Sequence, residues 1–228
     1  MHDVVLVHGA WHGAWAFDEV LPALEQRGLS AHAVELPLQG FPGDAAAARA
    51  AIEAAGPGAV VVGHSYGGFV ISAAARDLHV GHLVYMTAFM VDEGEDPWAP
   101  WFARPVLLHD AIAQGTDGRL STDLVHEALY ADSDRATTGR LIDKLRPMPQ
   151  KGPPIDFSDP AWRHIPSTYV VCSRDQAIHP EVQRHMSRHA GTVIEWDCDH
   201  SPFMTRPAEI AALIASLVST ETDPEERQ

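Results

Sequence analysis

The 228-residue sequence contains only two cysteines, Cys172 and Cys198, which is too few for a disulfide framework. Their spacing is not that of a redox or zinc CxxC pair, and we expect both to be buried packing residues. No apolar run approaches the roughly 18 residues of a transmembrane helix, and the first residues lack the charged and apolar regions of a secretory signal. We therefore expect a cytoplasmic protein that does not span a membrane.

Basic residues are also scarce, with 16 Lys and Arg against 31 Asp and Glu and a formal net charge of −15. A chain of this charge is repelled by phosphate backbones and anionic lipid surfaces, so we expect no nucleic-acid or membrane partner. Apart from the tail at 221–228, the acidic residues are spread along the chain. We interpret them as a solubility feature and infer nothing from them about the charge of a substrate.

Short apolar runs instead alternate with segments of helical spacing, in a chain long enough for one domain with a substantial core. Strands are predicted at 4–7, 31–36, 59–62, 82–86, 168–172 and 192–196, and helices at 17–27, 45–55 (capped by Asp44), 69–77, 181–189 and 207–218. This alternation predicts an α/β fold with a mostly parallel central sheet and helices on both faces.

The alternation stops between residues 92 and 160. Prolines, tryptophans and charges crowd the start of this stretch, and two helices are predicted within it, at about 122–130 and 134–145. We expect 92–160 to form a small helical cap over the strand ends, where parallel sheets place their sites. Residues 1–91 and 161–228 would then form the core.

The segment Gly63-His64-Ser65-Tyr66-Gly67-Gly68 follows an apolar run and precedes a helix-compatible stretch. This is G-x-S-x-G in the strand–turn–helix context of a nucleophile elbow. The turn strains the serine backbone so that its hydroxyl stands clear of the sheet, and small neighbours let strand and helix approach. A glycine-rich turn can carry an incidental serine, but the preceding strand and the glycine pair favour Ser65 as a nucleophile.

A serine hydroxyl needs a base to take its proton, and the base needs an acid to orient it. Behind such an elbow the acid and then the base follow in loops after late strands. Asp175 and His200 each come just after a predicted strand, so we predict Ser65, Asp175 and His200 as the catalytic residues. Asp92 is the reserve for the acid, and Asp199, directly before the histidine, is a further candidate.

Acyl transfer also needs an oxyanion hole, made by backbone N–H groups of the residue after the nucleophile and of the loop after the first strand. These positions are Tyr66 and Ala10. Large apolar residues near loop ends or in the expected cap would form an apolar substrate pocket, although ordinary packing explains any one of them equally well. They are Trp11, Phe89, Trp98, Trp101, Phe203 and Met204.

The remaining histidines do not indicate a metal site. His185 and His189 are four apart on a predicted helix, but no third ligand is placed near them. His12, in the loop after the first strand, is interpreted as shaping that loop. We expect neither a metal nor another cofactor.

Together these motifs resemble the α/β-hydrolase superfamily, and within it the branch of plant methylesterases and hydroxynitrile lyases, with small bacterial hydrolases. The resemblance rests on residues 7–15, 63–68 and 86–90 and on Asp199-His200 before a Pro-Ala-Glu-Ile helix, and it covers the flanks of the chain better than the expected cap. It implies Ser65, Asp175 and His200 as a triad, with Ala10 and Tyr66 as oxyanion donors.

Departures from the resemblance bear on the reaction. Hydroxynitrile lyases of this branch place a threonine beside the first-strand histidine and a lysine after the catalytic histidine, where this sequence has Gly9 and Ser201. Without that cation, cyanide elimination loses its charge stabiliser. Tyr66 stands where leucine or phenylalanine is common in the plant enzymes.

We therefore predict a serine hydrolase that cleaves a small, largely apolar carboxylic ester through an acyl-enzyme. The alternatives are a hydroxynitrile lyase-type C–C lyase and a ligand-binding receptor with a vestigial triad. An epoxide hydrolase or dehalogenase would need an aspartate at the elbow in place of Ser65. Both a monomer and a homodimer are consistent with the sequence.

Overall fold

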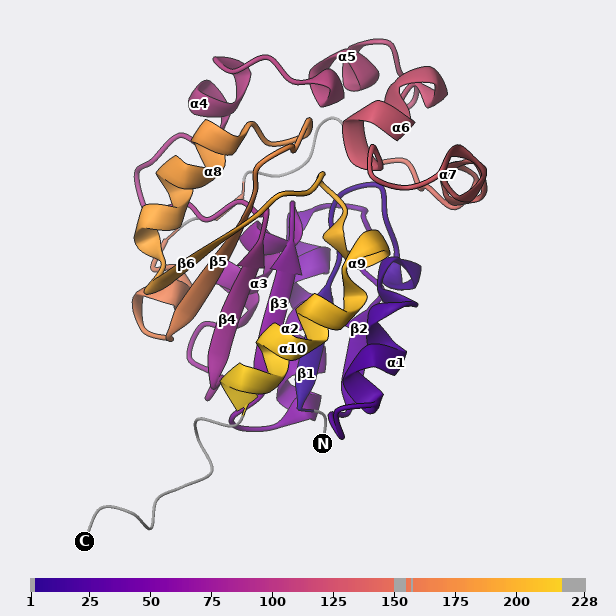
Figure 1. The fold of residues 1–228 in the computed structure, drawn as a ribbon. Helices are drawn as coiled ribbons and strands as arrows, with labels where there is room; N and C mark the ends of the chain where they lie inside the picture. Colours follow the sequence, from indigo (N-terminus) through magenta and orange to yellow (C-terminus); the bar gives the residue numbers. More distant parts are fainter. Residues whose placement is uncertain (1–2, 150–154, 157, 219–228) are drawn as a thin grey trace, which may run out of the picture.

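The computed structural model describes residues 3–149, 155–156 and 158–218. Its centre is a six-stranded sheet with the order β2-β1-β3-β4-β5-β6, in which every neighbouring pair is parallel (Figure 1). The strands are β1 (Val4–Val7), β2 (Ala31–Val34), β3 (Val60–His64), β4 (His82–Met86), β5 (Ser167–Cys172) and β6 (Thr192–Trp196). The four inner strands are almost entirely buried, as expected for continuous apolar runs covered on both faces.

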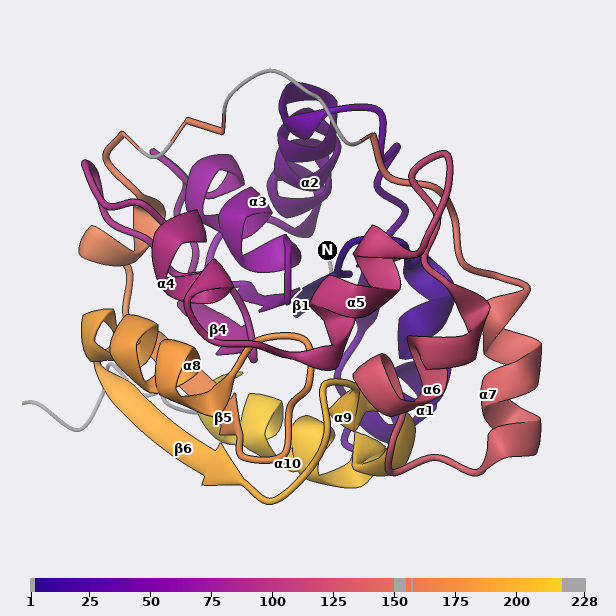
Figure 2. The ribbon, with the colours of Figure 1, turned by 90° about the horizontal axis from the view of Figure 1, so that it is seen from above.

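Helices cover both faces of this sheet (Figures 1 and 2). On one face α1 (Val20–Glu25) packs against α10 (Pro207–Val218), and on the other α2 (Phe41–Ala55) packs against α3 (Gly67–Ala74). Helix α8 (Pro180–Met186) lies between β5 and β6, and the short α9 (Pro202–Thr205) leads into α10. Among the described residues, 3₁₀ turns lie at Ala14–Phe17, Ala161–Arg163 and Ser187–His189. The predicted α/β fold with a parallel sheet is confirmed.

The prediction that Asp44 caps the second helix is wrong. Helix α2 begins at Phe41 with Gly40 as its N-cap, so Asp44 lies inside the first turn and is buried. Its carboxylate accepts hydrogen bonds from the N–H of Leu38 (2.7 Å) and the hydroxyl of Tyr66 (2.8 Å). These two donors hold the carboxylate of Asp44 in the interior, so it does not cap the helix.

The segment between β4 and β5 contains α4 (Trp98–Phe102), α5 (Leu107–Ala113), α6 (Thr122–Leu129) and α7 (Arg135–Ile142). These helices lie above the carboxyl ends of the strands (Figure 1). Helices α6 and α7 are those that the sequence predicted, and the side chain of Asp134 caps α7 by accepting the N–H of Thr137 (2.9 Å). Part of the loop before β5 and the acidic tail at 221–228 lie outside the described residues.

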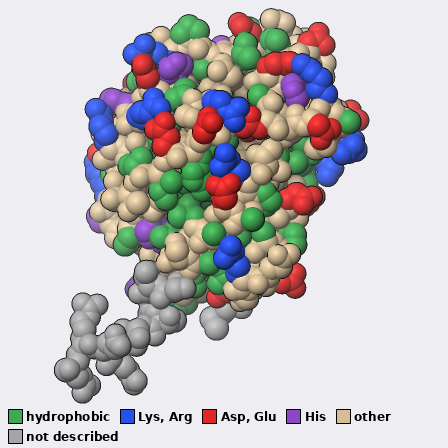
Figure 3. All heavy atoms as spheres, in the orientation of Figure 1, with side chains coloured by type: hydrophobic (Ala, Val, Ile, Leu, Met, Phe, Trp, Pro, Cys, Tyr) green, Lys and Arg blue, Asp and Glu red, His purple; other side chains and the backbone are tan. Residues whose placement is uncertain are grey.

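The face of the molecule drawn in Figure 3 mixes charges of both signs, with Lys and Arg side chains beside Asp and Glu. Ion pairs such as Arg174–Asp132 (2.8 Å) and Arg184–Glu195 (2.6 Å) join them. In the part of the chain that the structure describes, none of the helices has the length and apolar character needed to cross a membrane.

Candidate active site

Ser65 lies in the turn between β3 and α3 and has a φ of 53°. This left-handed conformation is costly for a residue with a Cβ atom, and it is the strained backbone expected of an elbow. The glycines after it are sterically required. A Cβ atom on Gly67 would lie 2.5 Å from the carbonyl oxygen of Val7, and one on Gly68 would overlap the carbonyl oxygen of Phe89.

Backbone contacts fix the Ser65 turn against its surroundings. Its N–H donates to the carbonyl of Met86 (3.3 Å), and its own carbonyl accepts the N–H of Phe89 (3.1 Å). Gly9, in the loop after β1, lies directly against it, since a Cβ atom there would be 2.9 Å from both the Cβ of Ser65 and the Nδ1 of His64. Ser65 is consequently only 8% exposed.

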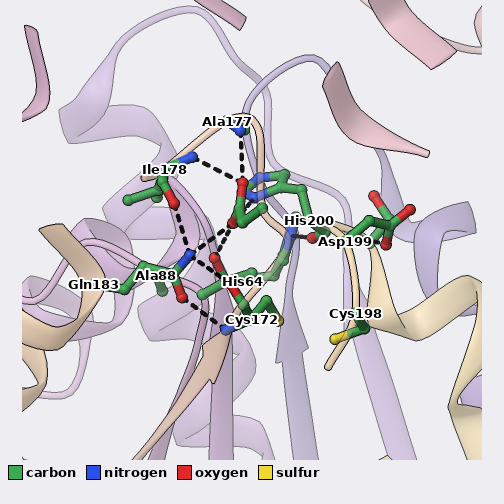
Figure 4. Close-up of polar contacts among 12 residues, drawn as sticks. His64, Ala88, Cys172, Ala177, Ile178, Gln183, Cys198, Asp199 and His200 are labelled. Atoms are coloured by element: carbon green, nitrogen blue, oxygen red, sulfur yellow. Dashed lines mark hydrogen bonds and ion pairs between the residues drawn. The ribbon is translucent and has the colours of Figure 1, made fainter. Parts of the chain in front are cut away.

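Asp175 follows β5 and His200 follows β6, and the structure brings their side chains together. Nδ1 of His200 lies 2.7 Å from Oδ2 of Asp175, and both residues are buried. The carboxylate accepts hydrogen bonds from the N–H groups of Ala177 (2.6 Å) and Ile178 (2.9 Å) and from Nε2 of Gln183 (3.0 Å), three residues labelled in Figure 4. It also accepts from the hydroxyl of Thr87. Because the carboxylate is an acceptor, Nδ1 of His200 carries the proton and Nε2 is left as the acceptor.

His64, which directly precedes Ser65, connects the elbow to the histidine loop. Its Nε2–H donates to the carbonyl of His200 (2.8 Å), and the two ring centroids are 4.7 Å apart. Burial, followed by the proximity of His200, holds the pKa of His64 well below its ordinary value, so its ring is neutral. The sequence does not predict this contact. A histidine has no specific pattern that would link it to His200, and the one available clue is that His64 directly precedes the predicted nucleophile.

The two other candidate acids have different partners. Asp199 accepts the N–H of Ser201 (2.9 Å) and the N–H of Asp132 (2.8 Å), and burial raises its pKa. Asp92 forms an ion pair with Arg163 (2.5 Å). Asp175 is therefore the candidate acid that the structure places on the ring of His200.

The loop after β1 brings Ala10 to the same region. The carbonyl of Ala10 accepts a hydrogen bond from Nδ1 of His12 (2.8 Å), and Trp11 has a left-handed φ of 62°. Across the described residues, neither the N–H of Ala10 nor that of Tyr66 donates to a protein acceptor. Burial lowers the pKa of His12 to about 3, so this histidine is neutral and shapes the loop as expected.

A family model described as "Alpha/beta hydrolase family" matches residues 4–213. The chain belongs to the alpha/beta hydrolase family. It is 28% identical to alpha/beta hydrolase nvfD of Aspergillus novofumigatus (92% of this chain and 94% of that protein) and 27% identical to Methylesterase 2 of Arabidopsis thaliana (89% and 90%). The solved structure of polyneuridine aldehyde esterase shares the fold, with a TM-score of 0.80 at 18% identity over 95% of this chain and 99% of that one. The predicted resemblance to the methylesterase-like branch is confirmed, and its esterase-named members support a carboxylic ester hydrolase.

In this hydrolase the side chain of Tyr66 is tied to a second buried group. Its hydroxyl donates to Oδ2 of Asp44 (2.8 Å), whose Oδ1 accepts the N–H of Leu38. Burial raises the pKa of both side chains, and the nearby Asp44 carboxylate raises that of Tyr66 further. The phenol is thus fixed by α2, an arrangement that neither residue's local sequence indicates.

Three of the predicted substrate-facing residues of the hydrolase form one aromatic cluster with Phe69. The rings of Phe69 and Phe89 stack at 4.5 Å, and Trp98 lies 5.6 Å and 5.7 Å from them. Trp101 packs on Phe89 at 5.9 Å and on Trp98 at 5.8 Å, and Trp98 is 40% exposed. The cluster therefore extends from the loop beside Ser65 to the surface.

The other three predicted substrate-facing residues lie apart from this cluster. Phe203 is fully buried, and its ring packs against His64 (4.9 Å) and His12 (5.7 Å). Met204 follows it in α9 and is half-buried. Trp11 is half-buried, and its indole N–H donates to the carbonyl of Gly118 (2.9 Å).

Cys172 and Cys198 are free and buried, as predicted. A hydrogen bond between the two thiols, together with burial, raises the pKa of Cys172. Outside the masked positions 1–2, 150–154, 157 and 219–228, no group of three or more His, Cys, Asp or Glu side chains is arranged to hold a metal ion.

Proposed function

We propose that this hydrolase cleaves small, largely apolar carboxylic esters through an acyl-enzyme on Ser65. The observation that carries the proposal is the buried Asp175–His200 pair, with its 2.7 Å contact, joined through His64 to the turn in which Ser65 has a left-handed φ. Nε2 of His200 takes the hydroxyl proton as Ser65 attacks the ester carbonyl, and then gives it to the leaving alcohol. Water cleaves the acyl-enzyme by the same route, and Asp175 stabilises the charged imidazole.

The N–H groups of Ala10 and Tyr66 would hold the oxyanion of the tetrahedral intermediate. Both are without a protein acceptor among the described residues, and Tyr66 is the N-cap of α3, whose dipole adds a positive potential. Removal of a single oxyanion donor typically costs about 10²–10³ in kcat. Two such donors would therefore supply a large part of the rate enhancement at this site.

The pocket that we propose for the apolar part of the ester is the cluster of Phe89, Trp98 and Trp101. Phe89 is the residue whose N–H holds the carbonyl of Ser65, so the cluster begins next to the nucleophile. The other two residues come from α4, in the segment 92–160, which we propose as a cap. Relatives named as methylesterases agree with a small ester as substrate.

The lack of room for a side chain at Gly9 favours ester hydrolysis over cyanohydrin cleavage, because the threonine hydroxyl of the lyases has no place there. A threonine there would place its Cβ atom 2.9 Å from the Cβ of Ser65, in a loop held by several hydrogen bonds. Ser201, the residue after the base, is fully buried, and its hydroxyl has no hydrogen-bond partner among the described residues. No cationic side chain therefore occupies the position that would stabilise departing cyanide.

The test is turnover of short aryl and methyl esters by wild type and Ser65→Ala, across about pH 5 to 9. We expect the variant to lose at least about 10³-fold in kcat, because the remaining oxyanion donors and binding supply only part of the rate. Ser216→Ala, at an exposed serine of α10, is the matched control and should be fully active.

Full activity of a folded Ser65→Ala variant would refute the proposal. Absence of ester turnover in the wild type would favour the receptor alternative, and cyanide release from mandelonitrile would favour the lyase.

A further inference from the structure

Arg146, which follows α7, contacts the loop that carries Ala10. Its backbone N–H donates to the carbonyl of Trp11 (2.7 Å). Its guanidinium donates twice to the carbonyl of His12, from Nε (3.0 Å) and from Nη2 (2.6 Å). The two residues are 134 positions apart in the sequence, so this is a tertiary contact between the segment 92–160 and the core.

The neighbouring carbonyls of the same loop are held as well. The carbonyl of Gly9 accepts from Nδ1 of His8 (2.8 Å), and that of Ala10 from Nδ1 of His12 (2.8 Å). With the two carbonyls held by Arg146, four successive peptide planes are fixed. The N–H of Ala10 belongs to the same trans peptide as the carbonyl of Gly9 and points the opposite way, so His8 sets its direction and the three following peptides, two of them held by Arg146, keep the chain in place.

The guanidinium also reaches the histidine that orients the peptide of Ala10. Its Nη2 lies 3.4 Å from Nε2 of His8, and that nitrogen accepts the N–H of Leu36 (3.1 Å). Burial lowers the pKa of His8 to about 4, against the raising effect of the hydrogen bond to Gly9, so the ring is neutral. Its Nδ1 carries the proton, because its partner is the carbonyl of Gly9. Arg146 thus contacts both ends of the segment that carries the proposed oxyanion donor.

An acidic partner sets the position of the guanidinium itself. Nη1 of Arg146 pairs with Oε1 of Glu35 (2.7 Å), and Oε2 of Glu35 accepts the N–H of Ala14 (2.8 Å). Glu35 therefore holds the far end of the loop while it orients the arginine. Between these contacts Trp11 keeps its left-handed φ of 62°, a conformation that a non-glycine residue retains only where its surroundings impose it.

We propose that Arg146 is a positioning residue for the oxyanion hole: it clamps the loop after β1 so that the N–H of Ala10 faces the nucleophile. This inference rests on the proposed function and concerns the same site. Arg146 acts through the loop and does not touch the reacting atoms. The segment 92–160 then supplies part of the catalytic geometry in addition to covering the substrate.

The experiment compares wild type, Arg146→Ala, Arg146→Lys and Ser65→Ala. For each we measure kcat and KM on a short aryl ester, and the affinity for an aryl trifluoromethyl ketone, which binds a catalytic serine as a tetrahedral oxyanion. Arg184→Ala is the matched control, because it removes an exposed arginine of α8 whose guanidinium pairs with Glu195, on a different element from the loop after β1.

For Arg146→Ala we expect a fall in kcat of about 10- to 100-fold, below the cost of removing a donor outright, with KM within about threefold. Affinity for the ketone should fall by the same factor as kcat/KM, because both depend on the oxyanion donors. Arg146→Lys should be intermediate, since an ammonium cannot reproduce the planar guanidinium contacts. Millimolar guanidinium should restore part of the rate to Arg146→Ala.

The clamp is refuted if folded Arg146→Ala keeps the wild-type kcat and ketone affinity, or if its loss lies in KM alone. If Arg146→Ala fails to fold, Arg146→Lys replaces it, and wild-type values of kcat and ketone affinity in that variant refute the clamp. Failure of the proposed function is recognised separately, because Ser65→Ala would then turn over the ester as fast as the wild type.

Discussion

Replacing Asp175 by asparagine tests the site most sharply, because every contact of this carboxylate is with a donor. Oδ1 accepts the N–H groups of Ala177 and Ile178, and Oδ2 accepts from Gln183, Thr87 and His200. Asparagine has one acceptor oxygen and an amide that only donates. Whichever way the new side chain turns, its NH₂ group faces groups that donate to the native residue.

The structure decides which orientation asparagine takes. The N–H groups of Ala177 and Ile178 belong to the backbone and cannot reverse, so the amide oxygen must stay with them. The NH₂ group then replaces Oδ2, where the hydroxyl of Thr87 can rotate to accept. His200 must also accept, and it does so by moving its proton from Nδ1 to Nε2, which leaves it unable to take the proton of Ser65.

The expected magnitudes follow from this arrangement. The wrong tautomer of the base costs about 10⁴-fold in kcat in a serine protease triad, and we expect a similar loss here. Gln183 cannot adapt by flipping, because its Oε1 accepts the N–H of Cys172 (2.8 Å) while its Nε2 also donates to the carbonyl of Ile178 (2.7 Å). Nε2 of Gln183 keeps the carbonyls of Cys172 (3.2 Å) and Ile178 as acceptors, but it loses its hydrogen bond to Oδ2 and faces another donor there, which lowers the free energy of unfolding by about 1 kcal/mol.

The assay is steady-state ester hydrolysis with urea unfolding of the same preparations. Asp92→Asn is the control, because Asp92 is the reserve candidate and instead pairs with Arg163. It should change kcat less than about threefold, as expected for an ion pair outside the site. If Asp175→Asn keeps kcat within tenfold of wild type, or if Asp92→Asn is the inactive variant, the assignment of the acid is wrong.

Two further predictions concern pH and packing. Burial lowers the pKa of His12 to about 3, so below about pH 6.5 the unfolded chain binds a proton that the folded chain does not. As the pH falls from 6.5 toward 3, the free energy of unfolding therefore decreases by about 1.4 kcal/mol per pH unit. Urea unfolding should show a shallower fall between pH 6.5 and 4.5 for His12→Gln than for wild type or for His79→Gln at an exposed position, and equal slopes would contradict it. Gly68→Ala should lower the free energy of unfolding by about 1–3 kcal/mol or more and abolish activity, because its Cβ overlaps a backbone oxygen. Gly43→Ala in α2, where a Cβ meets nothing within 4 Å, should be neutral or stabilising by up to about 1 kcal/mol in the same assay, and similar losses in both variants would refute the steric argument.

The features that sequence predicts here are those set by local pattern. Strands β1, β4 and β6 begin and end where their apolar or β-branched runs do, and the elbow follows from the glycines on either side of Ser65. The sequence does not predict helix α4, because WAPWF contains a proline and is too short to show a helical period. The sequence does not show that Asp44 is buried, because its partners, Leu38 and Tyr66, come together only in the folded chain.

The residues that hold Asp175 in place also depend on the folded structure and not on a local pattern. Thr87 lies in a stretch that contributes to the family resemblance, yet its contact with Asp175 depends on the register of β4 beside β5. Gln183 looks like an ordinary polar residue of α8, but it is fully buried beneath that carboxylate. Neither position carries a local signal, because the need for a hydrogen-bond donor arises from a residue on another element.

The segment 92–160 shows little of the family resemblance. It nevertheless holds the loop after β1 at three points. Gly118 accepts the indole N–H of Trp11, the hydroxyl of Tyr130 contacts Nε2 of His12 (2.6 Å), and Arg146 binds two carbonyls of the loop. The same segment contributes Trp98 and Trp101 to the proposed pocket. A change in this segment that alters the fit of the substrate can therefore also move the proposed oxyanion donor Ala10, so we expect specificity and rate to be coupled in this hydrolase. The flanks of the chain define the chemistry of the proposed triad, and substrate preference has to be derived from the contacts that 92–160 makes with them.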